Sequence, residues 1–141
     1  MFLGTLGGAQ SFAYAINEYG QVVGEAATSA GEYHAFLWED GVMTDLGTLG
    51  DTPLGLSVSL AEDINDVGQV VGESSVPNGQ RHAFLWENGV MTDLGTLGGP
   101  SSRAIDINEA GQVVGWSLTP NGHKHAFLWE DGVITDLGTL G

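Results

Sequence analysis

Apolar residues in this chain fall in short runs, and glycine, asparagine and aspartate separate one run from the next. The runs are rich in Val, Ile, Phe, Trp and Thr, which favour strands, and they lack the 3.6-residue period of an amphipathic helix. Residues 34–38 show the pattern best, because alternation places two aromatic rings on one face and alanine and leucine on the other. Both faces are apolar, so we expect this strand to be covered on both sides, as in stacked sheets.

The same stretch, His-Ala-Phe-Leu-Trp, occurs three times, beginning at His34, His82 and His125, with spacings of 48 and 43 residues. Gln-Val-Val-Gly accompanies every copy, and Leu-Gly-Thr-Leu-Gly occurs four times, once near the start of the chain. A pattern of this period predicts an array of similar units. We therefore divide the chain into a terminal strand stub and three units: residues 1–8, 9–50, 51–98 and 99–141.

Each unit is expected to contain four strands. The first ends at an Ile-Asn step, the second contains Gln-Val-Val-Gly, the third is His-Ala-Phe-Leu-Trp, and the fourth follows an Asp-Gly or Asn-Gly pair. Such pairs are strong hairpin signals because both residues tolerate positive φ. The predicted first strands are 12–16, 60–64 and 103–107, and the predicted fourth strands begin at Val42, Val90 and Val133.

Two all-β architectures suit three four-stranded units. One is a propeller-type repeat, in which each unit is a blade. Three blades are too few for a comfortable ring, so this interpretation predicts a homodimer in which a second chain completes six blades head to tail. The alternative is a monomeric β-trefoil. The copy of Leu-Gly-Thr-Leu-Gly at residues 3–7 is interpreted as the end of a missing unit or as a strand lent to a neighbouring unit.

Composition narrows the range of partners. Eighteen acidic residues stand against three basic ones in 141 residues, giving a net charge of −15, while 42% of residues are hydrophobic. Nucleic acid and anionic membranes are poor partners for such a chain, because no basic patch exists to neutralise phosphates. The absence of cysteine excludes disulfides and thiolate metal sites. Residues 1–8 lack the features of a signal peptide, and no run approaches the roughly 20 apolar residues of a membrane span.

The repeated Ile-Asn, Gly-Gln-Val-Val-Gly, His-Ala-Phe-Leu-Trp and Asp-Leu-Gly-Thr-Leu-Gly segments resemble the bacterial HAF repeat, a family named for its His-Ala-Phe. The resemblance covers essentially the whole chain. It implies a repeat architecture, usually in longer arrays, and an extracellular location. It implies no catalytic residues, because the family has no established activity.

The repeated histidines are open to two interpretations. Three imidazoles meeting on a three-fold axis would suit zinc. A histidine that begins every unit is explained more simply as part of a structural network inside that unit, as in the His, Trp and Asp networks of WD-repeat propellers. We therefore expect neither a metal nor a cofactor. The predicted network residues are His34, Trp38, Asp45, His82, Trp86, Asp93, His125, Trp129 and Asp136.

Acidic turns such as the one at residues 63–68 superficially resemble the start of a calcium loop. The first unit has Ala15 where the others have Asp63 and Asp106, and no glutamate follows at the required spacing. Turn formation therefore explains these carboxylates better.

Function is expected where the copies differ. The middle unit carries an insertion within residues 51–62, which either forms a contact surface or caps its own core. The candidate contact residues are Pro53, Leu54, Leu56, Trp116 and Tyr19. No singular nucleophile–base or paired-carboxylate set stands out. The sequence favours a non-enzymatic structural or interaction module with a protein or saccharide ligand. A lectin or carbohydrate-active enzyme is the alternative.

Overall fold

The computed structural model describes residues 3–141, and this part of the chain is all-β, with no helix. It forms three separate four-stranded antiparallel sheets, which confirms the prediction of four strands in each of three units. The first sheet comprises β1 (Gly7–Ile16), β2 (Val22–Thr28), β3 (Tyr33–Glu39) and β4 (Val42–Gly47). The second comprises β5 (Ser59–Ile64), β6 (Val70–Ser75), β7 (Arg81–Glu87) and β8 (Val90–Gly95). The third comprises β9 (Ser102–Ile107), β10 (Val113–Leu118), β11 (Lys124–Glu130) and β12 (Val133–Gly138).

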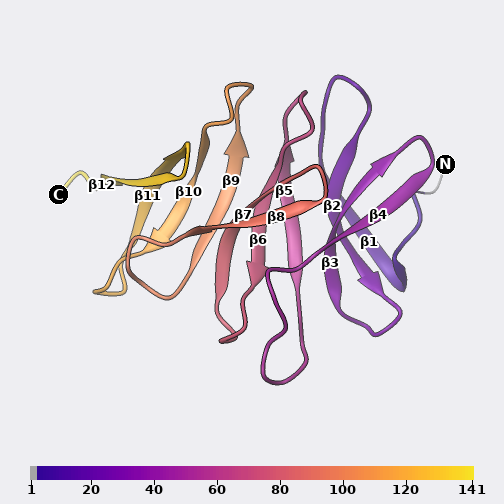
Figure 1. The fold of residues 1–141 in the computed structure, drawn as a ribbon, viewed down its shortest axis with the longest axis horizontal. Helices are drawn as coiled ribbons and strands as arrows, with labels where there is room; N and C mark the ends of the chain where they lie inside the picture. Colours follow the sequence, from indigo (N-terminus) through magenta and orange to yellow (C-terminus); the bar gives the residue numbers. More distant parts are fainter. Residues whose placement is uncertain (1–2) are drawn as a thin grey trace.

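Each sheet is a simple meander in which strands consecutive in the chain are hydrogen-bonded neighbours. The sheets follow one another along the long axis of the molecule, and the two ends of the chain lie at opposite ends of that axis (Figure 1). The first strand of each following sheet makes the junction: β5 packs against β2 and β3, and β9 packs against β6 and β7. We call the sheets and their connections unit 1, unit 2 and unit 3.

The hairpin between the third and fourth strands follows from its turn residues. Asp40, Asn88 and Asp131 have φ of 49°, 51° and 49°, and the glycine after each of them also has positive φ. Two consecutive residues with positive φ define the turn whose twist matches that of paired strands. The Asp-Gly and Asn-Gly pairs therefore close these hairpins as predicted.

A glycine inside each second strand has a different role. A Cβ atom at Gly72 would overlap the carbonyl oxygen of Leu60 on the neighbouring strand, and Gly24 and Gly115 meet the same obstacle. An irregularity in the pairing of the first and second strands lies beside each of these glycines. Glycine is thus required here for close approach of two backbones.

The core is divided into two clusters of the same composition, one at each junction. Each cluster combines a valine, an alanine and a leucine from one unit with an alanine, an isoleucine, a valine and a phenylalanine from the next. The first holds Val23, Ala35, Leu46, Ala61, Ile64, Val70 and Phe84, and the second holds Val71, Ala83, Leu94, Ala104, Ile107, Val113 and Phe127. Both clusters lie between units, so packing between units stabilises the fold.

Candidate functional site

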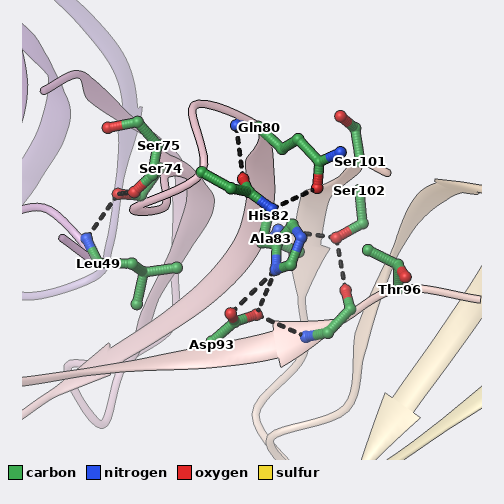
Figure 2. Close-up of polar contacts among 12 residues, drawn as sticks. Leu49, Ser74, Ser75, Gln80, His82, Ala83, Asp93, Thr96, Ser101 and Ser102 are labelled. Carbon is green, nitrogen blue, oxygen red and sulfur yellow. Dashed lines mark hydrogen bonds and ion pairs between the residues drawn. The ribbon is translucent and has the colours of Figure 1, made fainter. Parts of the chain in front are cut away.

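Every unit contains a histidine–aspartate clamp between its third and fourth strands. Nδ1 of His82 lies 2.9 Å from the nearer carboxylate oxygen of Asp93, and the same carboxylate accepts the Gly95 N–H at 2.8 Å (Figure 2). His34 with Asp45 and His125 with Asp136 repeat this geometry. The clamp fixes the end of the fourth strand, where the chain leaves one unit for the next.

The clamp of unit 3 lowers the pKa of its aspartate. The hydrogen bond from His125, supported by the Gly138 N–H, holds the pKa of Asp136 below its usual value. A carboxylate that accepts such bonds is stabilised in its ionised form. The clamp of unit 3 is therefore built around an ionised aspartate.

The structure brings each histidine to the aspartate of its own unit, whereas two of the three predicted tryptophans pack against the core. Trp86 and Trp129 lie against the first and second core clusters. Among residues 3–141, no three His, Asp or Glu side chains are grouped so that they could hold a metal ion. The three imidazoles thus face three separate carboxylates.

A serine hydroxyl links each junction. The pairing of β7 with β8 shifts register between Ala83 and Phe84, and the Ala83 N–H bonds instead to Oγ of Ser102 in the next unit, at 2.9 Å. The same hydroxyl donates to the carbonyl oxygen of Gly95 at 2.6 Å (Figure 2). Ser59 makes the equivalent pair of bonds to Ala35 and Gly47 at the first junction.

A second serine receives the connecting chain. The Leu49 N–H donates to Oγ of Ser74 at 2.7 Å, and the Leu97 N–H donates to Oγ of Ser117 at 2.8 Å. Neither set of serines was predicted from the sequence. The signal was present, because a serine stands five residues before every Ile-Asn step and two residues after the close-approach glycines of units 2 and 3.

An asparagine ladder runs across the turns between first and second strands. Nδ2 of Asn17 donates to the backbone carbonyl of Asn65 at 3.1 Å, and Nδ2 of Asn65 donates to that of Asn108 at 3.0 Å. Each asparagine side chain also holds a glutamine in its own turn, as Asn108 holds Gln112. The Ile-Asn step is thus both a turn signal and a link between units.

The second junction also contains a carboxyl pair. Burial and, after it, the neighbouring Asp106 carboxyl raise the pKa of Asp63 to about 6, while the Ile107 N–H bonds to Asp63 Oδ2 at 3.0 Å. Two carboxyl groups this close share a proton more readily than they both ionise. Unit 1 has Ala15 at the equivalent position, so the first junction has no such pair.

Each end of the stack exposes residues whose equivalents are buried at the junctions. Ile16 on unit 1 is 68% exposed, whereas Ile64 is 5% exposed. Leu137 on unit 3 is 56% exposed, whereas Leu94 is 5% exposed. We call Ala13, Ile16 and Val22 the head face, and we call Val114, Ala126 and Leu137 the tail face.

Both end faces are hollowed. A hollow of about 360 Å³ on the head face is lined by Leu3, Ala13, Tyr14, Ala15, Ile16 and Val22. A hollow of about 230 Å³ on the tail face is lined by Asp106, Ile107, Asn108, Gln112, Val114 and Leu128. Val22 in the first hollow and Val114 in the second are the equivalents of Val70 and Val71, which are buried at the inner junctions.

The predicted contact residues lie at separate places. Pro53, Leu54 and Leu56 of the insertion line a hollow of about 420 Å³ beside Arg81. Tyr19 is exposed in the turn after β1. Trp116 belongs to β10, and Nζ of Lys124 lies 4.2 Å from the centre of its ring. Only the insertion residues are brought together, and a cation already covers the tryptophan face.

A smaller rim hollow of about 200 Å³ adjoins the insertion and contains two glutamates, Glu25 and Glu73. Glu73 is buried and lies 3.2 Å from Nη1 of Arg81 and 3.9 Å from Nη1 of Arg103. The Glu73 carboxylate is therefore already engaged by two guanidinium groups. This hollow suits polar recognition better than glycoside hydrolysis.

The described residues form no helix that could cross a membrane. Comparisons with protein-family models, with curated proteins and with solved structures found no match to this chain.

Proposed function

We propose that this chain is a non-enzymatic structural module that self-associates through its end faces. Two copies join head to tail and form a closed, six-unit, propeller-type ring. One observation carries the proposal: the exposed head-face and tail-face residues are the equivalents of residues that bury each other at both inner junctions. A surface that buries its own copies twice within the chain is suited to do so between chains.

The two ends also carry polar groups equivalent to those that bond to each other at the inner junctions. At the inner junctions, the alanine N–H of one unit bonds to the serine hydroxyl of the next. The tail face offers the equivalent N–H of Ala126, and Ser11 beside the head face offers the hydroxyl. The asparagine ladder would continue likewise, from Nδ2 of Asn108 to the carbonyl of Asn17 in a second copy.

The charge pattern also favours this docking. Asp106 lies at the tail end, where its equivalent Asp63 faces the next unit. In a head-to-tail junction Asp106 would meet Ala15 rather than a third aspartate. A second pair of close carboxyl groups is thereby avoided, and such pairs oppose association when both groups are ionised.

The number of units agrees with a ring. Propellers contain four to eight blades of four-stranded sheets, and two copies supply six. The strands of each unit pair only within their own sheet among the named strands, which supports blades over a β-trefoil, whose barrel joins strands of different units. The resemblance to HAF repeats agrees with an array of this kind.

Light scattering at increasing concentration tests the ring. We expect a mass near twice 14.7 kDa at about 100 µM. Ile16→Asp on the head face should abolish the association, because it buries a charge at the junction. The matched control is Val90→Asp, since Val90 is 62% exposed in a hairpin away from both end faces, and it should associate normally. A single 14.7 kDa species at every concentration contradicts the ring, and so does a mass that grows without limit.

A second candidate function is saccharide binding at the rim. The hollow of about 200 Å³ places the Tyr33 ring beside the Glu25, Glu73 and Arg81 side chains, which is the mixture of an aromatic ring and polar groups that sugars use. Calorimetric titration with neutral oligosaccharides tests it. Tyr33→Ala should remove any binding, whereas Tyr19→Ala should not change it.

A further inference from the structure

The Leu-Gly-Thr-Leu-Gly segments connect one unit to the next. The inner connectors, residues 46–50 and 94–98, leave the fourth strand of one unit and cross to the following unit. There the carbonyl oxygens of Gly47 and Gly95 accept the hydroxyl protons of Ser59 and Ser102. A connector is therefore part of every inner junction.

The N-terminal connector, residues 3–7, occupies the equivalent position on unit 1. Oγ of Ser11 donates to the carbonyl oxygen of Gly4 at 2.7 Å, as Ser59 donates to Gly47. Leu3 and Leu6 are half-buried there. The head face thus already holds a connector, although no unit precedes it among the described residues.

The C-terminal connector, residues 137–141, has the same sequence but a different setting. Leu140 is fully exposed, whereas its equivalents Leu49 and Leu97 are half-buried. In a head-to-tail junction the Gly138 carbonyl would need the Ser11 hydroxyl of the second copy. A hydroxyl group donates one hydrogen bond, so Gly4 and Gly138 compete for it.

Two features favour the C-terminal connector over the N-terminal connector as the partner of the Ser11 hydroxyl. The Gly138 N–H is held by Asp136 at 2.7 Å, so this connector leaves its strand in a fixed direction. The N-terminal connector has Phe2 at the position of that aspartate. It also lacks the serine bond of the inner connectors, because Ala26 stands where Ser74 and Ser117 bind them, and it is held instead by the pairing of residues 6–7 with Thr28.

We propose that residues 3–7 are a placeholder on the head face, and that residues 137–141 of a second copy displace them when the end faces join. This inference rests on the proposed head-to-tail association. It places residues 137–141 of the second copy beside Ser11, next to the head face. The N-terminal connector therefore opposes assembly, and the C-terminal connector promotes it.

The identical sequences of the two connectors allow a matched test. Leu6→Asp and Leu140→Asp make the same substitution at the same position of the same five residues and add the same charge. We expect Leu6→Asp to tighten self-association about ten-fold, because the placeholder is held less well. We expect Leu140→Asp to weaken association about ten-fold. Dissociation constants come from sedimentation equilibrium, and circular dichroism checks that each variant folds.

Hydrogen exchange on the wild-type chain gives a readout that does not depend on a variant. On association, amides of residues 3–7 should exchange faster and amides of residues 137–141 should exchange more slowly. Association that is weakened by Leu6→Asp, or unchanged by Leu140→Asp, overturns the placeholder. A wild-type mass that stays at 14.7 kDa at every concentration is a different result, because it removes the proposed association itself.

Discussion

At the scale of single residues, the junctions depend on side chains that satisfy backbone groups of the neighbouring unit. Ser102 is the clearest case, since its hydroxyl serves a buried N–H from β7 and a carbonyl at the end of β8. Unpaired buried groups of this kind cost more than the bond itself contributes. The serines therefore stabilise packing between units more than they stabilise any one unit.

Replacing one of these serines should reveal this role. We expect Ser102→Ala to lower the free energy of unfolding by about 2 kcal/mol, because the Ala83 N–H and the Gly95 carbonyl lose their partner in a buried site. Urea denaturation measures the change. Ser11→Ala is the matched control, and its effect should be smaller in a dilute monomer, where no N–H of another unit reaches it. Equal losses for the two variants would refute the argument.

The carboxyl pair at the second junction predicts an unusual dependence of stability on pH. The pKa of Asp63 in the folded protein is about 6, above its ordinary value of 3.8. A raised folded pKa means that the stabilisation is complete below pH 3.8 and is lost as pH rises through about 6. We expect Asp63→Asn to raise the free energy of unfolding at pH 8 by about 1–2 kcal/mol, allowing for solvent screening.

Thermal denaturation between pH 4 and pH 8 checks this prediction. The advantage of Asp63→Asn over the wild type should be largest at pH 8 and smallest at pH 4. Asp106→Asn should relieve the same repulsion, so the two substitutions together should give less than the sum of their separate effects. A gain that does not vary with pH would rule out a shared proton.

At the scale of elements, alternation and turn residues predicted most of the strands, and their failure at β1 is informative. The first strand was predicted at residues 12–16, but β1 begins at Gly7. Residues 7–10 read Gly-Gly-Ala-Gln, which has no alternation of apolar and polar residues. They extend the strand because Gly7 pairs with Thr28 beyond an irregularity in the register. Pairing with β2 therefore places these residues in the strand, and nothing in their own sequence predicts that pairing.

Glycines in two elements should respond differently to alanine. Gly72 in β6 has no room for a Cβ atom, because the Leu60 carbonyl oxygen occupies that space. Gly89 in the hairpin turn has open space but a φ of 85°. We expect Gly72→Ala to destabilise the protein by about 3 kcal/mol or more, and Gly89→Ala by about 1 kcal/mol. Chemical denaturation compares them, and the reverse order would contradict the steric argument.

The candidate site was less predictable than the strands. The invariant histidines drew attention to the clamps, whose aspartates were correctly named as possible partners, and the structure places each pair 2.9 Å apart. The serines of the junctions were missed because a small polar residue inside a strand pattern looks like a solvent-facing position. The end faces were also missed, because Ile16 and Ile64 have the same local sequence pattern and differ only in what packs against them.

At the scale of the whole molecule, the three units form a stack that exposes, at each end, residues whose equivalents are buried at the inner junctions. Sequence predicted the number of units, but the rotation from one unit to the next depends on packing at the junctions and leaves no local pattern. That rotation decides whether two copies close a ring or begin a filament. The light-scattering experiment proposed above therefore measures a property of the junctions.

Association should also appear in thermal stability. Because a second copy binds only the folded chain, the Tm of the wild type should rise with protein concentration. Ile16→Asp removes this dependence if the head face is the docking surface, whereas Val90→Asp retains it. Differential scanning calorimetry over a hundred-fold range of concentration makes the comparison. A wild-type Tm that does not vary with concentration would contradict the dimer.

The asparagine ladder has a consequence for how copies can meet. Every rung has the same polarity, because a side-chain amide of one unit donates to a carbonyl of the next unit towards the C-terminus. Two tail faces brought together would set one Asn108 amide against the other, and two head faces would set carbonyl against carbonyl. The molecule therefore has two chemically different ends, and the ladder can continue from one copy to another only when a tail face meets a head face.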